Sequence, residues 1–257
     1  MNTSSQAHLS QRPARVTVIG DALVEVHRDE RGSREFVGGR GVDAAIGLSV
    51  LGDEATLVAA VGGDEDGDRV RSVLGDYGVR LVAVASASGT RRVVVERTTG
   101  DRIGMGIGRD LPEREEGLGA GALGLDEAAR TTITGADLVV VTGLTLTDPL
   151  VDELIAALER PGLRLVVDAA APAGMPRADA DLPARLDRLA TSALFTVPAD
   201  DDAPVAAVAH LLARGVAHDS PAAWDAALDA ASATLAATAL PGRTAPRPRP
   251  APTDQGS

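Results

Sequence analysis

The sequence predicts an α/β protein built on a doubly wound, mostly parallel sheet that carries a small β lid. Short runs of β-branched residues alternate with longer stretches of helical periodicity, which is typical of an α/β layer fold. Hairpin-like sequence interrupts this alternation near the front of the chain. The apolar content of 44% is sufficient for one core. We therefore expect a single domain over residues 15–240, between a disordered leader at 1–14 and a disordered Pro/Arg tail at 241–257.

The front half of the chain has the pattern of strand–helix units. RVTVIGD at 15–21 is an apolar strand that ends in Gly-Asp, and ATLVAAVGGD at 55–64 is the next buried strand. Between them, GVDAAIGLSVLG at 41–52 spaces its apolar residues at helical intervals and ends in glycine, a favourable C-terminal cap. An amphipathic helix follows at 66–78.

The middle of the chain has a hairpin pattern, after which the alternation of strand and helix resumes. TRRVVVERTTGDRIGMGIG at 90–108 consists of two strand-like runs around a polar turn, which predicts a hairpin. Buried strands follow at 136–143 and 163–170, and an Asp-Pro pair opens the helix at 149–162 between them. A Ser-Pro pair at 220–221 opens the last helix in the same way.

Composition excludes several chemistries. The chain carries 37 acidic and 25 basic residues, for a net charge of −12, and every basic residue other than histidine is an arginine. Without lysine there is no Schiff-base enzyme and no Walker-type phosphate loop. Without cysteine there is no thiol nucleophile, zinc–thiolate cluster or disulfide framework.

Charge and hydropathy also limit the partners that we expect. An acidic chain with one Trp, one Tyr and two Phe lacks the basic surface and the stacking platforms that nucleic acid requires. No apolar run approaches the roughly 20 residues that span a bilayer. The four histidines show no metal-ligand spacing. We expect a soluble, cytoplasmic protein with neither nucleic acid nor membrane as a partner.

Three segments of the front half resemble the PfkB/ribokinase family of sugar kinases. They are VIGDALVEV, FVGGRGVDAAIGLSVLG and LVAAVGGDEDGDRVRSVLGDYGV, and they occur in the family's order and at its spacing. In that family a first strand ends in Gly-Asp or a similar pair, a Gly-Gly turn opens a helix beside the sugar, and a vGxDxfG stretch leads into the next helix. The resemblance runs from about Arg15 to Asp168 and implies a ribokinase-like fold.

The resemblance also implies a sugar site. The sugar hydroxyls would be held by Glu25, where the family usually has Asp, by the Gly38–Gly39 turn, and by Asp43, where the family usually has Asn. Lid strands at about 22–38 and 90–108 would close over the sugar. The glycines would let the backbone approach a ligand, and the helix that follows would present unpaired N–H groups to its oxygens. The alternatives are that the glycines only form a tight turn and that the two acids are ordinary solvated side chains.

The back half of the chain departs from the family pattern. The segment 169–195 is shorter than the roughly 30 residues of one strand–helix–strand unit. We therefore expect the sheet to be truncated in the C-terminal half, with this part largely missing. Because the only asparagine is Asn2, the family's Asn-x-x-Glu magnesium motif is also absent.

The segment 196–202 resembles the family's phosphate loop in a degenerate form. Asp202 would be the catalytic base, whereas Ala199, Asp200 and Asp201 stand where the family has residues that contact the nucleotide. Each extra carboxylate about 4 Å from a phosphate charge costs roughly 4 kcal/mol at an effective dielectric constant near 20. The alternative is that these acids only cap the helix that follows.

The resemblance implies ATP- and Mg²⁺-dependent phosphorylation of a sugar hydroxymethyl group, and the acidic turn predicts that this activity is impaired. The expected partner is a small sugar or nucleoside, and the resemblance further implies a homodimer through the lid. The alternative is a non-catalytic sugar-binding or regulatory pseudokinase. A third possibility is a remnant that folds poorly because its sheet is truncated.

Overall fold

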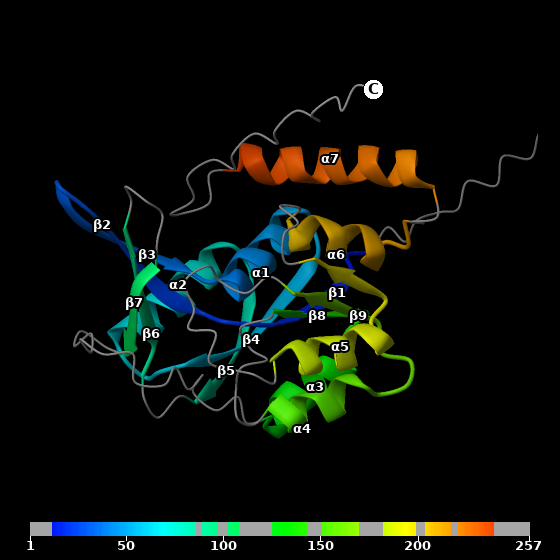
Figure 1. The fold of residues 1–257 in the computed structure, drawn as a ribbon, viewed down its shortest axis with the longest axis horizontal. Coiled ribbons are helices and arrows are strands. Elements are labelled where there is room, and N and C mark those ends of the chain that lie inside the picture. The colour runs from blue at the N-terminus through cyan, green and yellow to red at the C-terminus, as the bar shows by residue number, and fades with distance from the viewer. Residues whose placement is uncertain are drawn as a thin grey trace, which may run out of the picture.

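The computed structural model describes residues 12–85, 89–96, 102–107, 125–142, 151–169, 182–198, 204–216 and 220–238. These residues form two sheets and the helices that pack on the larger sheet (Figure 1). Within the described part of the chain, no helix is long and apolar enough to span a bilayer.

The main sheet is parallel throughout and has six strands. Its order is β10-β9-β8-β1-β4-β5, and every neighbouring pair in it is parallel. Because β1 lies between β4 and β8, the chain builds the sheet outward from β1 in both directions, which is the doubly wound arrangement that the sequence predicted. The strands are β1 (Arg15–Ile19), β4 (Glu54–Val61), β5 (Arg80–Ala85), β8 (Leu138–Thr142), β9 (Leu165–Asp168) and β10 (Phe195–Val197).

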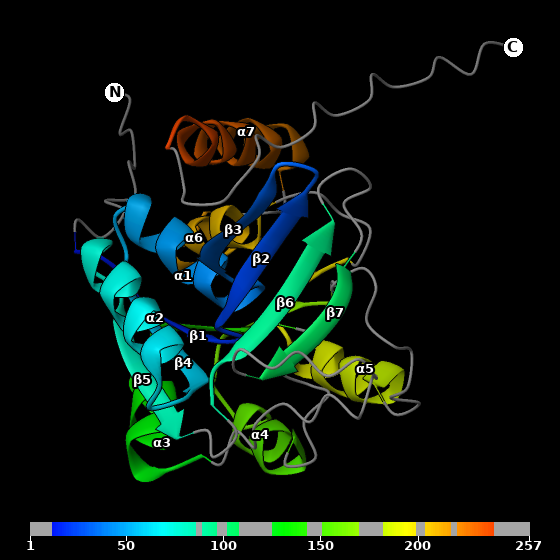
Figure 2. The ribbon, with the colours of Figure 1, turned by 90° about the vertical axis from the view of Figure 1, so that its left-hand side faces the viewer.

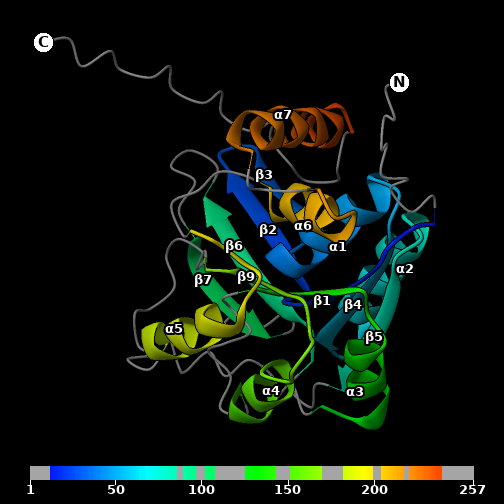
Figure 3. The same cartoon turned by 90° about the vertical axis from the view of Figure 1, so that its right-hand side faces the viewer.

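Helices cover both faces of this sheet (Figures 1 and 3). One face carries α1 (Arg40–Val50), α2 (Glu65–Asp76) and α6 (Val205–Ala213), with α7 (Pro221–Ala237) packed outside α6. The other face carries α3 (Glu127–Thr134), α4 (Val151–Leu158) and α5 (Leu182–Ser192). Alternate strand residues therefore enter two separate apolar clusters, such as Val18 in one and Ile19 in the other.

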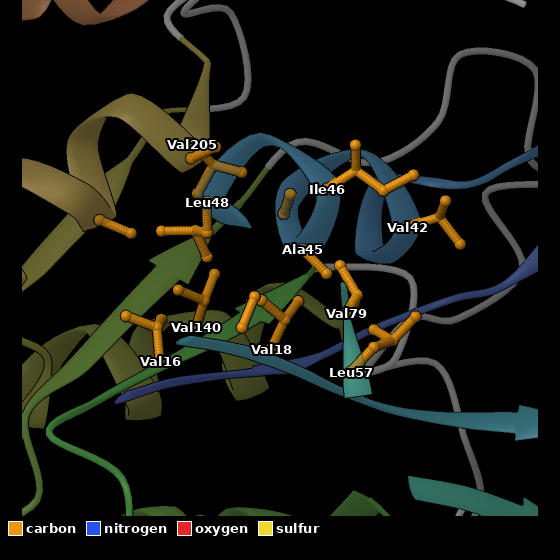
Figure 4. Close-up of a cluster of buried hydrophobic side chains, with 14 of the residues drawn as sticks. Val16, Val18, Val42, Ala45, Ile46, Leu48, Leu57, Val79, Val140 and Val205 are labelled. Carbon is orange, nitrogen blue, oxygen red and sulfur yellow. The ribbon is translucent and has the colours of Figure 1, made fainter. Parts of the chain in front are cut away.

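The first of these clusters joins α1, α6 and the sheet. Figure 4 shows Ala45 and Leu48 of α1 directed toward Val18 and Val140 of the sheet, with Val205 of α6 beside Leu48. Burial of one such aliphatic side chain contributes about 1.5–3 kcal/mol. The packing therefore fixes α1, whose first turn lies at the carboxyl ends of the strands.

The lid is a smaller mixed sheet of four strands in the order β3-β2-β6-β7 (Figure 2). Its strands are β2 (Leu23–Asp29), β3 (Gly32–Gly38), β6 (Arg91–Glu96) and β7 (Arg102–Ile107). β2 pairs antiparallel with β3, and β6 pairs antiparallel with β7 as the predicted hairpin. The two hairpins join through the parallel pair β2–β6. The small β lid predicted from the sequence is therefore present.

Among the described residues the sheet is truncated in the C-terminal half as predicted, but segment 169–195 is not lost and the truncation begins one strand later than expected. This segment contains α5 and leads directly into β10, which pairs in parallel with β9. A complete strand–helix–strand unit fits here because both strands are very short, with four and three residues. The sheet is therefore continuous one strand beyond β9, and among the described residues it ends at β10. Thr196 and Val197 belong to this strand and not to a loop.

Candidate functional site

The carboxyl ends of three adjacent strands meet the first turn of α1. Asp21 follows β1, Thr142 ends β8, and Asp168 ends β9. Arg40 is the first residue of α1. The strand order reverses at β1, and in open α/β sheets this reversal at the carboxyl edge is where ligands bind.

Asp21 satisfies the free backbone donors of α1. Its carboxylate accepts hydrogen bonds from the N–H groups of Arg40 and Gly41 at 3.2 and 3.3 Å. Its carbonyl oxygen accepts a bond from the N–H of Val42 at 3.3 Å. The N–H of Asp43 bonds to the Gly39 carbonyl within the turn, at 2.9 Å. The expectation that this helix presents unpaired N–H groups to a ligand is therefore wrong, because Asp21 caps the helix from the end of β1.

The glycine turn is shaped around the same aspartate. A Cβ atom at Gly39 would lie 2.6 Å from Asp21 Oδ2, and one at Gly41 would lie 2.7 Å from the Asp21 backbone nitrogen and oxygen. Gly39 also has a φ of 109°, a conformation that side chains other than glycine rarely adopt. The close backbone approach predicted for this turn is thus made to Asp21.

Arg40 forms a bidentate ion pair with Asp168. Its Nε and Nη2 atoms donate to the two carboxylate oxygens of Asp168, each at 2.7 Å. The Asp168 side chain is fully buried, whereas the Arg40 side chain is 32% exposed. Burial alone would lower the pKa of Arg40, but the hydrogen bond and charge of Asp168, with the charges of Asp21 and Asp43, hold that pKa above its ordinary value. Arg40 is therefore a permanent counterion for this edge of the sheet.

The structure places Glu25 against Gly38. Glu25 is on β2, and a Cβ atom at Gly38 would lie 3.1 Å from Glu25 Cγ and Cδ. The Glu25 carboxylate forms a hydrogen bond with Nε2 of His27 at 2.9 Å, and the His27 ring meets Phe36 edge to face at 5.2 Å. The Glu25 side chain is only 19% exposed. Two of the residues singled out in the sequence are thus in contact where the lid meets α1.

Asp43 lies in the first turn of α1 and is half-buried. It is close enough to Arg40 for its charge to act on that guanidinium. The acids at this edge and on the adjoining lid strand β2 are Asp21, Glu25, Asp43 and Asp168.

The predicted phosphate-side residues Ala199, Asp200, Asp201 and Asp202 lie outside the described residues. The flanking elements are described. β10 ends at Val197, in register with Asp168, and α6 begins at Val205. The first turn of α6 packs on the C-terminal half of α1, since a Cβ at Gly47 would lie 2.7 Å from the Cβ of Ala206.

The described residues do not fit a magnesium ion. Nowhere in the described ranges do three or more His, Asp or Glu side chains gather in a way that could hold a metal. The carboxylates of Asp21 and Asp168 are already engaged by α1 amides and by Arg40.

Sequence reasoning missed the Arg40–Asp168 pair and the capping role of Asp21. Arg40 and Asp168 are 128 positions apart, so no local pattern connects them. The available signals were an arginine inside a glycine turn and an aspartate at the end of a buried strand. Only the strand order brings these two places together.

Comparison with known proteins gives matches at the level of structure. No family model and no curated protein matches the sequence. The fold is similar to that of an uncharacterized sugar kinase from Pyrococcus horikoshii, with a TM-score of 0.58 at 17% identity over 70% of this chain and 61% of the other. It is also similar to a PfkB-family carbohydrate kinase from Listeria grayi, with a TM-score of 0.57 at 15% identity over 83% and 67% of the two chains.

A third neighbour is the aminoimidazole riboside kinase of Salmonella enterica, solved with aminoimidazole riboside and an ATP analogue. Its TM-score is 0.54 at 18% identity, over 70% of this chain and 58% of the other. The chain thus spans less than two thirds of the length of the first and third of these structures. Together the neighbours show that this chain has the fold of the PfkB-family sugar kinases, as its sequence resemblance predicted.

Proposed function

We propose that the protein binds a small polyhydroxylated molecule, a sugar or a nucleoside, where the lid sheet meets the first turn of α1. Glu25, the Gly38–Gly39 turn and Asp43 would contact it. The observation that carries this proposal is the partly buried Glu25 carboxylate held against Gly38. The riboside in the Salmonella enterica kinase supports the ligand class by likeness of fold.

The charge of the site supports hydroxyl groups as the recognised chemistry. A carboxylate only accepts hydrogen bonds, so Glu25 and Asp43 fit the hydroxyl donors of a sugar. Asp21 takes up the α1 amides that would otherwise attract an anion, and Asp168 binds Arg40 in two places. The α1 amides and the Arg40 guanidinium, which could attract an anion, are thus already bonded to acids of the chain itself.

We further propose that phosphoryl transfer from ATP to a hydroxymethyl group is impaired. The sequence places Asp200 and Asp201 beside Asp202, the residue aligned with the family's catalytic base. Added carboxylates repel the triphosphate that such a turn would have to bind. The alternative is a protein that binds a sugar without catalysis, as a sensor or a regulatory subunit. Both forms share the sugar site and differ only in turnover.

A thermal-shift and calorimetric screen with pentoses, hexoses and nucleosides tests the sugar site. We expect at least one ligand to raise the melting temperature. Glu25→Gln should weaken its binding about 10- to 150-fold, because one charged hydrogen bond of about 1.5–3 kcal/mol is lost. Glu30→Gln is the matched control, since Glu30 is exposed at the tip of the same hairpin. Failure of every ligand to shift the melting temperature would refute the sugar site.

We keep the homodimer through the lid as a separate proposal. β6 lies inside the lid sheet, so β3 and β7 are its edges. Arg34 lies on the exposed part of edge strand β3 and is a suitable probe of a contact through this edge. We expect Arg34→Pro to shift the elution volume in gel filtration toward the monomer, because proline removes a backbone donor from the edge. An unchanged dimeric volume contradicts an assembly through β3.

A further inference from the structure

Four charged side chains tie the lid sheet to α2. Arg92 lies on β6 and Glu35 on β3, whereas Asp66 and Arg69 lie in the first half of α2 (elements labelled in Figure 2).

Arg92 is the centre of this group. Its Nε and Nη2 atoms donate to Asp66 Oδ2 and Oδ1 at 2.5 and 2.8 Å, and its Nη1 atom donates to Glu35 Oε1 at 2.8 Å. Arg69 completes the chain of contacts by donating from Nη1 to Glu35 Oε2 at 2.6 Å. All three nitrogens of the Arg92 guanidinium are thus engaged by the two acids.

The group combines a buried pair with a more exposed one. The side chains of Arg92 and Asp66 are each 8% exposed, and those of Glu35 and Arg69 are each 36% exposed. Hydrogen bonds from Arg92 and Arg69 lower the pKa of Glu35 to about 2, so its carboxylate stays charged over the physiological range. Asp66 stands where the vGxDxfG pattern has an apolar residue, so the buried pair is a departure of this chain from that pattern.

A buried ion pair contributes little net stability compared with apolar side chains of the same volume, but it accepts few geometries. This distinction suggests positioning as the role of the group. The group bonds α2 to β3 and to β6, which are the two neighbours of β2 in the lid sheet. α2 is itself fixed in the core by Val70 and Leu74, both fully buried.

A second set of hydrogen bonds holds Thr90, the residue that precedes β6. The N–H and the Oγ1 hydroxyl of Thr90 donate to the carboxylate of Asp64, each at 2.7 Å, and Thr90 is fully buried. Asp64 also caps α2 through the N–H of Gly67 at 2.8 Å. Thr90, which precedes β6, and Arg92 within β6 are thus bonded to Asp64 and Asp66 at the N-terminus of α2.

We propose that Arg92, Asp66, Glu35 and Arg69 form a positioning clamp that fixes the lid sheet on α2. Because β2 lies between β3 and β6, the clamp also holds Glu25 of β2 against Gly38. The clamp itself is independent of the ligand. Its consequence for Glu25 rests on the proposed sugar site.

Hydrogen exchange of the full chain without ligand, read by mass spectrometry, tests the clamp. In Arg92→Met, which keeps the apolar stem of the side chain but removes its donors, we expect amides of β2, β3 and β6 to exchange at least about tenfold faster. Amides of β1 and β8 should keep their wild-type rates. Arg188→Met is the control, since Arg188 forms a bidentate pair with Glu159 on the surface. It should leave the lid unchanged.

Uniform acceleration in both sheets, or an unchanged lid, overturns the clamp. If Arg92→Met does not fold, Arg92→Lys and Glu35→Gln provide the same readout. Each removes part of the network and should accelerate exchange only in the lid, by a smaller factor. In the ligand screen, Arg92→Lys should weaken the binding of the same sugar whose binding Glu25→Gln weakens. A wild-type protein that binds no sugar refutes the proposed function and leaves the exchange result to decide the clamp.

Discussion

At the scale of single residues, Arg40 and Asp21 show how one turn serves the fold before it serves a ligand. The Gly-Gly-Arg-Gly turn resembles a ligand-binding turn, yet its amides and its close approaches are directed to Asp21. The arginine within it closes a pair with the buried Asp168. The donors of this turn are thus engaged within the chain, which supports the proposed preference for a ligand that donates hydroxyl groups.

Arg40→Met should destabilise the fold strongly. It leaves Asp168 buried without its counterion, and breaking a buried pair in this way costs about 3–5 kcal/mol. Arg40→Lys keeps the positive charge without the bidentate geometry, so it should lose less stability than Arg40→Met. Urea denaturation measures both. We expect the free energy of unfolding to decrease in the order wild type, Arg40→Lys, Arg40→Met. Equal stability of Arg40→Met and wild type contradicts this role of the pair.

Glu35 gives a prediction for the dependence of stability on pH. Arg92 and Arg69 lower its pKa from an ordinary value of 4.5 to about 2. A group whose pKa is lower in the folded state stabilises the fold above the unfolded pKa, and this contribution is lost as the pH falls through the folded pKa. Glu35→Gln should therefore lose less stability than wild type between about pH 5 and pH 2. Urea midpoints at several pH values, with Glu30→Gln as control, measure it, and parallel pH profiles refute it.

At the scale of elements, helix packing explains which patterns the sequence revealed. Strong apolar periodicity and clear caps predicted α1, α2 and α7 within a few residues of their observed bounds. α5 and β10 were missed because their unit is short and β10 has only three residues, two of them half-buried. In such a strand the pairing with β9 decides the structure, and pairing across the chain leaves no local pattern.

The contact between α1 and α6 predicts opposite effects of the same substitution at two glycines. Gly47→Ala adds a Cβ only 2.7 Å from the Cβ of Ala206, so overpacking should cost about 1–3 kcal/mol. Gly75→Ala in α2 meets nothing within 4 Å and should stabilise the helix by about 0.5–1 kcal/mol. Thermal unfolding of both variants is the measurement. A stabilised Gly47→Ala contradicts the close packing of α6 on α1.

At the scale of the whole molecule, the predictable part and the missed part of the site follow one physical rule. The family resemblance named Glu25 and Gly38 as members of one site, and the structure places the Glu25 side chain against Gly38. Arg40 with Asp168, and Arg92 with Asp66, were missed because each pair joins distant elements. The fold class needs only alternation of strand and helix, whereas side-chain pairs across a sheet need the strand order as well.

The proposal that the acids at 200–202 impair phosphoryl transfer on a sugar-kinase fold is tested by measuring turnover with ATP. ADP release is followed by a coupled assay with ATP, Mg²⁺ and each sugar or nucleoside that raises the melting temperature. We predict turnover below about 0.01 per second, compared with roughly 1–100 per second for kinases. Turnover in the ordinary range that is abolished by Asp202→Ala would contradict the claim.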